Sequence, residues 1–197
     1  MSNIIRLDKS GHLLVDGKIV NDSVAPLAIT AILVIDRSGS MAGAKAGFAS
    51  SGAWDFSQSA LNKGYRIATI DFASGGSITC SPSRQAEDVR RGCFADSVSG
   101  STDMHEGLRL ASSLGPRAGD TIVVVTDGAV DDPKSTLALG TKLKASGVEI
   151  LAIGTDDADK AFLSQLASRP DLGMKVVSSQ LRQAITDASK LLGTSRR

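Results

Sequence analysis

Asp36, Ser38 and Ser40 form the pattern D-x-S-x-S, which places one carboxylate and two hydroxyl groups within one short segment. The segment directly follows the apolar run of residues 28–35, so it is expected to be a tight loop at the end of a strand. Carboxylate and hydroxyl oxygens suit Mg²⁺ or Mn²⁺ better than Zn²⁺, because Zn²⁺ prefers nitrogen and sulfur. The segment therefore predicts binding of a divalent cation. Substitutions in it are expected to cost little packing, because loops lie on the surface.

Two further segments offer matching oxygen ligands. Asp127 follows the apolar run of residues 121–126, and Thr102 precedes a helix-like stretch at residues 103–114. Ligands of open α/β sheets bind at the carboxyl ends of the strands, so these loops are expected at the same edge of the sheet as Asp36. Each residue alone has an ordinary interpretation as a helix cap or a turn residue. Their joint placement around the two most apolar runs favours one shared site.

Apolar runs alternate with helix-like stretches from residue 28 onward. Strands are expected at residues 28–35, 65–72, 77–80, 121–126, 148–153 and 174–177. Helices are expected at residues 45–62, 86–94, 103–114, 133–145, 160–168 and 181–192. This alternation predicts an α/β fold with a central, mostly parallel sheet that is flanked by helices on both faces.

The first residues follow a different pattern. Residues 13–15 and 18–20 are apolar-rich and flank Asp16-Gly17, which predicts a β-hairpin at a sheet edge. We therefore divide the chain into an N-terminal β-hairpin extension, residues 1–27, and one domain, residues 28–197.

These segments resemble the von Willebrand factor type A (VWA) domain and its metal-ion-dependent adhesion site (MIDAS). In that family D-x-S-x-S is followed by a threonine and then by an aspartate. Thr102, within G-S-T-D-M, and Asp127, within V-T-D-G, match these two positions. The resemblance covers residues 28–192 and is to stand-alone bacterial members of the family. It implies a three-layer, Rossmann-like VWA fold.

The resemblance also implies roles for the matching residues. Ser38 and Ser40 would bind the ion directly, and Thr102 would bind it directly or through water. Asp36 and Asp127 would act largely through water or through hydrogen bonds. The implied ion is Mg²⁺ or Mn²⁺, ahead of Ca²⁺, and it would capture a glutamate or aspartate of a partner protein.

The implied role is that of a scaffold or regulator in a bacterial multi-protein system. Candidate partners are an ATPase or a component of a kinase–phosphatase system. The family further implies that binding is coupled to movement of the last helix, residues 181–192.

A second hypothesis is a metal-dependent phosphatase or other hydrolase, and a third is a degenerate domain that binds its partner without metal. A phosphatase of the haloacid dehalogenase type needs a second aspartate where this chain has Ser38. The chain also lacks the P-loop motif and the G-x-S-x-G motif. His105 is expected on a helix surface rather than as a catalytic base. We therefore expect no enzymatic activity.

The net charge, the first residues and the cysteines indicate which classes of partner and which cellular location to expect. The net charge of +1 gives no reason to expect nucleic acid or an anionic membrane as a partner. The first residues lack the apolar core of a signal peptide, so a cytoplasmic location is expected. Cys80 and Cys93 follow no metal-binding or redox spacing and are expected to be reduced thiols.

Overall fold

The computed structural model describes residues 5–7, 13–15, 18–19, 28–95 and 100–193. These residues fall in two compact units, one within residues 1–28 and one within residues 29–195.

The first unit contains three short strands: β1 (Ile5–Leu7), β2 (Leu13–Val15) and β3 (Lys18–Ile19). β2 and β3 pair antiparallel, which confirms the predicted hairpin. β1, which the sequence did not predict, pairs antiparallel with β2. The hairpin thus belongs to a three-stranded sheet of its own rather than to an edge of the main sheet.

The second unit is built on a six-stranded sheet with the order β6-β5-β4-β7-β8-β9. β6 runs antiparallel to β5, and the other neighbours are parallel. The strands are β4 (Thr30–Asp36), β5 (Arg66–Phe72), β6 (Gly76–Ser83), β7 (Thr121–Thr126), β8 (Glu149–Thr155) and β9 (Gly173–Val176). The predicted α/β fold with a mostly parallel sheet is confirmed.

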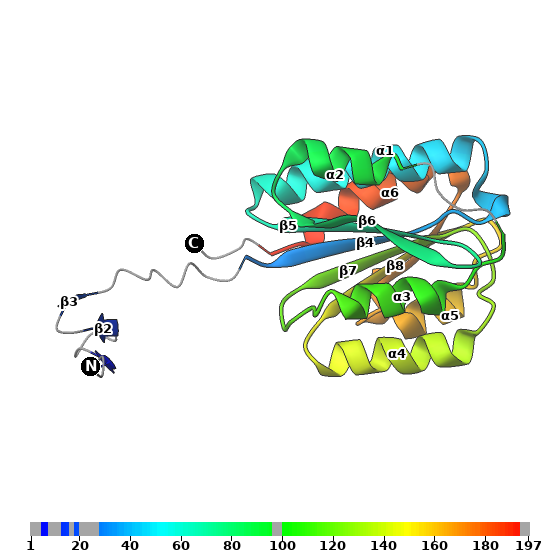
Figure 1. Ribbon diagram of the computed structural model, residues 1–197. Coiled ribbons are helices and arrows are strands. Elements are labelled where there is room, and N and C mark those ends of the chain that lie inside the picture. Colours follow the sequence, from blue (N-terminus) through cyan, green and yellow to red (C-terminus); the bar gives the residue numbers. More distant parts are fainter. Residues whose placement is uncertain (1–4, 8–12, 16–17, 20–27, 96–99, 194–197) are drawn as a thin grey trace. The chain divides into compact units, whose positions relative to one another are not determined.

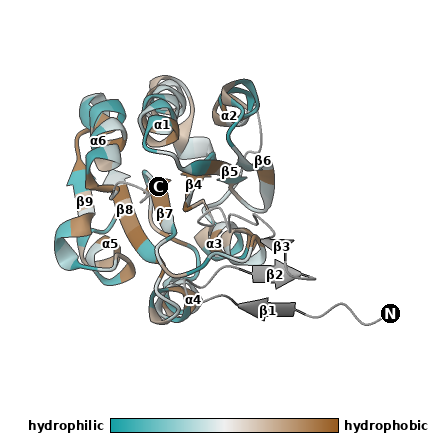
Figure 2. Ribbon diagram, turned by 90° about the vertical axis from the view of Figure 1, so that its left-hand side faces the viewer, coloured by the Kyte–Doolittle hydropathy of each residue, from teal (hydrophilic) through white to brown (hydrophobic). Residues whose placement is uncertain are grey.

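Helices cover both faces of this sheet. α1, α2 and α6 lie on one face, and α3, α4 and α5 lie on the other (Figures 1 and 2). The helices are α1 (Ala44–Asn62), α2 (Ala86–Cys93), α3 (Met104–Ser113), α4 (Pro133–Ala145), α5 (Lys160–Leu166) and α6 (Leu181–Ala188). The last helix is shorter than the predicted 181–192, because a 3-10 turn at Ser189–Leu191 follows α6. No helix among the described residues is long and apolar enough to cross a membrane.

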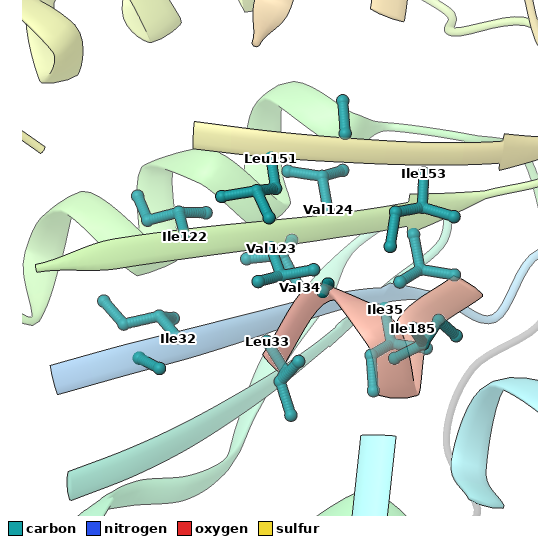
Figure 3. Packing of buried hydrophobic residues seen from close by; sticks show 14 of the residues in the cluster. Ile32, Leu33, Val34, Ile35, Ile122, Val123, Val124, Leu151, Ile153 and Ile185 are labelled. Atoms are coloured by element: carbon teal, nitrogen blue, oxygen red, sulfur yellow. The ribbon is translucent and has the colours of Figure 1, made fainter. Parts of the chain in front are cut away.

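The core lies between the sheet and its two helix layers. Every residue of β4 and of β7 is buried, as expected for central strands that are covered on both faces. Figure 3 shows aliphatic side chains of these strands packed with Leu151 and Ile153 of β8 and Ile185 of α6. Burial of one such side chain contributes about 1.5–3 kcal/mol. Polar groups of these strands are therefore concentrated at the strand ends.

The register of the two central strands determines which residues meet at the carboxyl edge. Ile35 of β4 lies opposite Val125 of β7, so Asp36 and Thr126 come next at the same level. The Asp36 loop and the Asp127 loop consequently leave the sheet side by side, toward the right of Figure 1.

Candidate functional site

Asp36 is the last residue of β4, and its side chain is completely buried. Its Oδ1 accepts a hydrogen bond of 2.7 Å from the Ser38 amide, and its Oδ2 accepts one of 2.6 Å from Thr126 Oγ1. Burial raises the pKa of Asp36, although these hydrogen bonds oppose the shift, and the neighbouring Asp127 adds to it. Asp36 thus joins the loop after β4 to the end of β7. The expectation that this position costs little packing is wrong for Asp36.

The two serines of the loop reach the second aspartate. Ser38 Oγ and Ser40 Oγ lie 3.1 Å apart. Ser40 Oγ donates a hydrogen bond of 2.7 Å to Asp127 Oδ1. Ser38 is buried, whereas Ser40 is exposed, and a 3-10 turn at Gly39–Met41 carries the second hydroxyl. One hydroxyl of the pair is therefore open to solvent at the sheet edge.

Thr102 completes the predicted set from a third segment. The Gly39 amide donates a hydrogen bond of 3.2 Å to the Gly100 carbonyl, which joins the first loop to the third. A Cβ atom placed on Gly128 would lie 3.7 Å from Thr102 Oγ1 and 3.9 Å from Ser40 Oγ. Hydroxyls from two separate loops therefore lie around the glycine that follows the second aspartate. The structure brings all five predicted residues together.

Backbone hydrogen bonds position Thr102 itself. Its carbonyl accepts a bond of 3.2 Å from the Asp131 amide, in the loop between β7 and α4. The next residue, Asp103, donates its amide to the Ala73 carbonyl at 2.7 Å and caps α3 by accepting from the Glu106 amide at 3.0 Å. A capping side chain satisfies an otherwise unpaired amide of the first helical turn. Thr102 is thus held between the loops after β5 and β7.

Arg37 holds the loop through a buried ion pair and hydrogen bonds, which the sequence did not predict. Its Nε lies 3.2 Å from Asp71 Oδ2, and both side chains are buried. Its guanidinium also donates to Ser50 Oγ at 2.9 Å and to the Cys93 carbonyl at 3.0 Å. Asp71 at the end of β5 therefore forms a buried ion pair with the loop. An arginine inside D-x-S-x-S resembles a solvated loop residue in sequence, and no local pattern marks it as buried.

Lys45 lies on the other side of the site and was also missed. Its Nζ donates to Asp127 Oδ2 and, at 2.9 Å, to Asp156 Oδ2. The Lys45 side chain is 22 % exposed, whereas the Asp127 side chain is fully buried. Lys45 stands in the first turn of α1, where a lysine has no favourable interaction with the helix dipole. The two carboxylates offset this unfavourable position.

The assembled groups are three hydroxyls and two carboxylates. Among the residues that the structure describes, no three histidine, cysteine, aspartate or glutamate side chains form a cluster that could hold a metal ion. The oxygens that could hold one belong to Asp36, Ser38, Ser40, Thr102 and Asp127. Such a donor set suits a hard cation.

Comparison with known proteins identifies the fold and the family. The family model of the von Willebrand factor type A domain matches residues 32–190, which is most of the chain and includes all five residues. The chain belongs to the VWA family. Human matrilin-1 is 43 % identical over 58 residues, which are 29 % of this chain and 11 % of matrilin-1. Human collagen alpha-1(XX) is 40 % identical over 65 residues, 33 % of this chain and 5 % of the collagen chain. The VWA chain thus matches only a small part of each relative.

Solved structures show the same fold. The vWF domain of the type V pili tip protein Mfa5 from Porphyromonas gingivalis superposes with a TM-score of 0.76 at 14 % identity, over 86 % of this chain and 97 % of that one. Proximal thread matrix protein 1 from the mussel byssus, with a zinc-occupied MIDAS motif, gives a TM-score of 0.66 at 18 % identity. That match covers 82 % of this chain and 46 % of the mussel protein. At these identities the likeness concerns the fold.

Further acidic residues surround the site of this VWA domain. Asp132 caps α4 by accepting a hydrogen bond of 3.0 Å from the Ser135 amide. Asp156 has a different role. It has a φ of 47°, in the left-handed region, and accepts hydrogen bonds from Lys45 and from Ser178 Oγ. Asp156 is therefore a partner of Lys45 rather than a helix cap.

The two cysteines of the VWA domain are free, as expected, and both are buried. Burial raises the pKa of the Cys93 thiol to about 12. Because the thiolate is the reactive form, we expect Cys93 to react at pH 8 with a disulfide reagent only after unfolding. Counting reactive thiols in native and urea-unfolded protein, with Cys80→Ser to isolate Cys93, checks this. Rapid reaction of native Cys93 would contradict the buried environment.

Proposed function

We propose that this VWA domain is a metal-dependent protein-binding module. The hydroxyls of Ser38, Ser40 and Thr102, together with the carboxylates of Asp36 and Asp127, hold Mg²⁺ or Mn²⁺. The bound ion captures a glutamate or aspartate of a partner protein.

One observation carries the proposal, and it is the meeting of three separate loops. Thr102 Oγ1 and Ser40 Oγ both lie near Gly128, and Ser40 Oγ is hydrogen-bonded to Asp127. A group of hydroxyl and carboxylate oxygens without a histidine or cysteine suits a cation that takes oxygen ligands. The residues present therefore fit the ion.

The residues of this site have different roles. A bound ion would act as a Lewis acid that attracts an anionic oxygen. Asp36 holds the loop in place through its bonds to Ser38 and Thr126, and Asp127 orients the Ser40 hydroxyl. Carboxylates that act through such hydrogen bonds orient the ligands of a metal, as outer-shell groups commonly do. An ion held in this way would retain much of its positive charge and could attract a carboxylate of the partner.

The partner is proposed only by its chemistry, as a protein segment that presents a glutamate or aspartate. Among similar proteins, one is a pilus tip protein and one is a byssus matrix protein with a zinc-occupied MIDAS motif. These relatives support a binding role and the inclusion of Zn²⁺ in metal titrations. An ATPase or kinase–phosphatase partner stays a prediction from the resemblance, and a cytoplasmic location stays a prediction from the sequence.

Metal binding is tested by thermal unfolding of EDTA-treated protein with added MgCl₂, MnCl₂ or ZnCl₂. A ligand of the native state at one hundred times its dissociation constant stabilises by about 2.7 kcal/mol. For a chain of this size each kcal/mol raises the melting temperature by about 2–4 °C. We expect Ser38→Ala Ser40→Ala to lose the metal-induced rise. Without metal it should unfold somewhat below the wild-type temperature, because Asp127 Oδ1 loses its donor.

A matched control replaces two serines at the far end of α3. Ser112→Ala Ser113→Ala should keep the full metal-induced rise, because neither side chain lies near the cluster. An unchanged rise in Ser38→Ala Ser40→Ala would refute the ligand set.

For the binding role, partner capture from the source cells should require Mg²⁺ and fail with EDTA. Robust turnover of phosphate or ester substrates would favour a hydrolase instead.

A further inference from the structure

The second aspartate of the site already has a cation beside it. Lys45 Nζ donates to Asp127 Oδ2, while Ser40 Oγ donates to Asp127 Oδ1. Both oxygens of this buried carboxylate are thus occupied by groups of the chain itself. A buried carboxylate without a partner is strongly disfavoured, so the ammonium group stabilises the site without a metal ion.

The charges around the site depend on this one lysine. Asp36 and Asp127 are both buried, and they repel each other. The guanidinium of Arg37 is directed to Asp71 instead, on the other side of the loop. Among the described residues, Lys45 is the cation paired with a carboxylate of the site. Its ammonium group therefore supplies the positive charge that a divalent ion would otherwise supply.

A second carboxylate gives the ammonium group an alternative partner. Lys45 Nζ lies 2.9 Å from Asp156 Oδ2, and the Asp156 side chain is 36 % exposed. Asp156 is held in turn by Ser178 Oγ, which donates to its Oδ1. Lys45 can therefore leave Asp127 and still keep an ion pair at the rim of the site.

We propose that Lys45 is a built-in competitor of the divalent ion: its ammonium group pairs with Asp127, and this pairing lowers the metal affinity of the site. The inference rests on the proposed function, because it concerns the same cluster. A divalent ion must either displace the Lys45 ammonium group from Asp127 or bind close to it despite the repulsion between their positive charges. Either requirement lowers the affinity of the site for the ion. Lys45 thereby limits loading to high metal concentrations.

Calorimetric titration of the whole chain with MgCl₂ and MnCl₂ tests this inference. Lys45→Met keeps a linear apolar side chain of similar length but removes the charge. We expect its dissociation constant for the ion to fall by about tenfold, because a screened like-charge repulsion near the ion is lost. Lys45→Arg, which keeps the charge, should bind the ion within about twofold of the wild type. Lys142→Met, an exposed charge removal near the end of α4, should leave the constant unchanged.

A second measurement separates competition from simple damage. Lys45→Met leaves Asp127 without its ion-pair partner, so the melting temperature of this variant without metal should fall. Its rise with saturating MgCl₂ should exceed the wild-type rise. Tighter binding with this larger rise supports the inference, as does binding by Lys45→Met when the wild type binds nothing. Equal or weaker binding by Lys45→Met, with a wild type that binds metal, would overturn it and make Lys45 a positioning residue for Asp127. If neither protein binds any of the ions, both the proposed function and this inference fail.

Discussion

Replacing Arg37 with methionine is expected to lower the free energy of unfolding by about 3–5 kcal/mol, because removal of one partner leaves the other charge of a buried ion pair uncompensated. Arg37 and Asp71 have side chains that are 7 % and 0 % exposed, so water cannot replace the lost partner. The substitution also removes the donors to Ser50 Oγ and to the Cys93 carbonyl. Urea unfolding of wild type and variant measures the change.

An exposed arginine provides the matched control for this substitution. Arg169 pairs with Asp171 on the surface, where both side chains are more than half exposed. Arg169→Met should change the free energy of unfolding by less than about 1 kcal/mol, as is usual for surface ion pairs. Adding Asp71→Asn to Arg37→Met should restore part of the loss, since it removes a buried charge whose ion pair with Arg37 has been lost. A loss below about 1 kcal/mol for Arg37→Met would show that the pair does not hold the loop.

Asp36→Ala is expected to abolish the metal-induced rise in melting temperature and to cost about 2–4 kcal/mol of stability. The stability loss follows because Ser38 N and Thr126 Oγ1 lose their acceptor, and each buried unsatisfied group costs about 1–3 kcal/mol. Removal of a buried charge that repels Asp127 offsets part of this cost. Urea unfolding without metal and thermal unfolding with MgCl₂ measure the two effects separately.

The isosteric variant distinguishes the two roles of this residue. Asp36→Asn keeps one side-chain oxygen as an acceptor and loses the charge, so it should be more stable than Asp36→Ala and still bind metal weakly. Were Asp36→Ala as stable as the wild type, the link between β4 and β7 would not matter for folding. A full metal-induced rise in Asp36→Ala would exclude Asp36 from the site.

The elements of the main fold could be predicted because strands buried on both faces have continuous apolar runs. The runs at 28–35 and 121–126 became β4 and β7, and their neighbouring helices fell close to the predicted limits. β1 was missed because a strand of Ile5–Leu7 is too short to show a period. Its pairing with β2 depends on contacts between segments rather than on local pattern.

The same reasoning applies to the site. The sequence alone indicated which oxygens meet, namely those of Asp36, Ser38, Ser40, Thr102 and Asp127, because parallel strands bring their carboxyl ends to one edge. Only the tertiary structure decided how the charges of that site are balanced. Arg37 turns inward to Asp71, and Lys45 reaches carboxylates 82 and 111 residues away in the chain. Such pairs form across loops without a periodic pattern, so their partners are determined by the packing of the whole sheet and its helices.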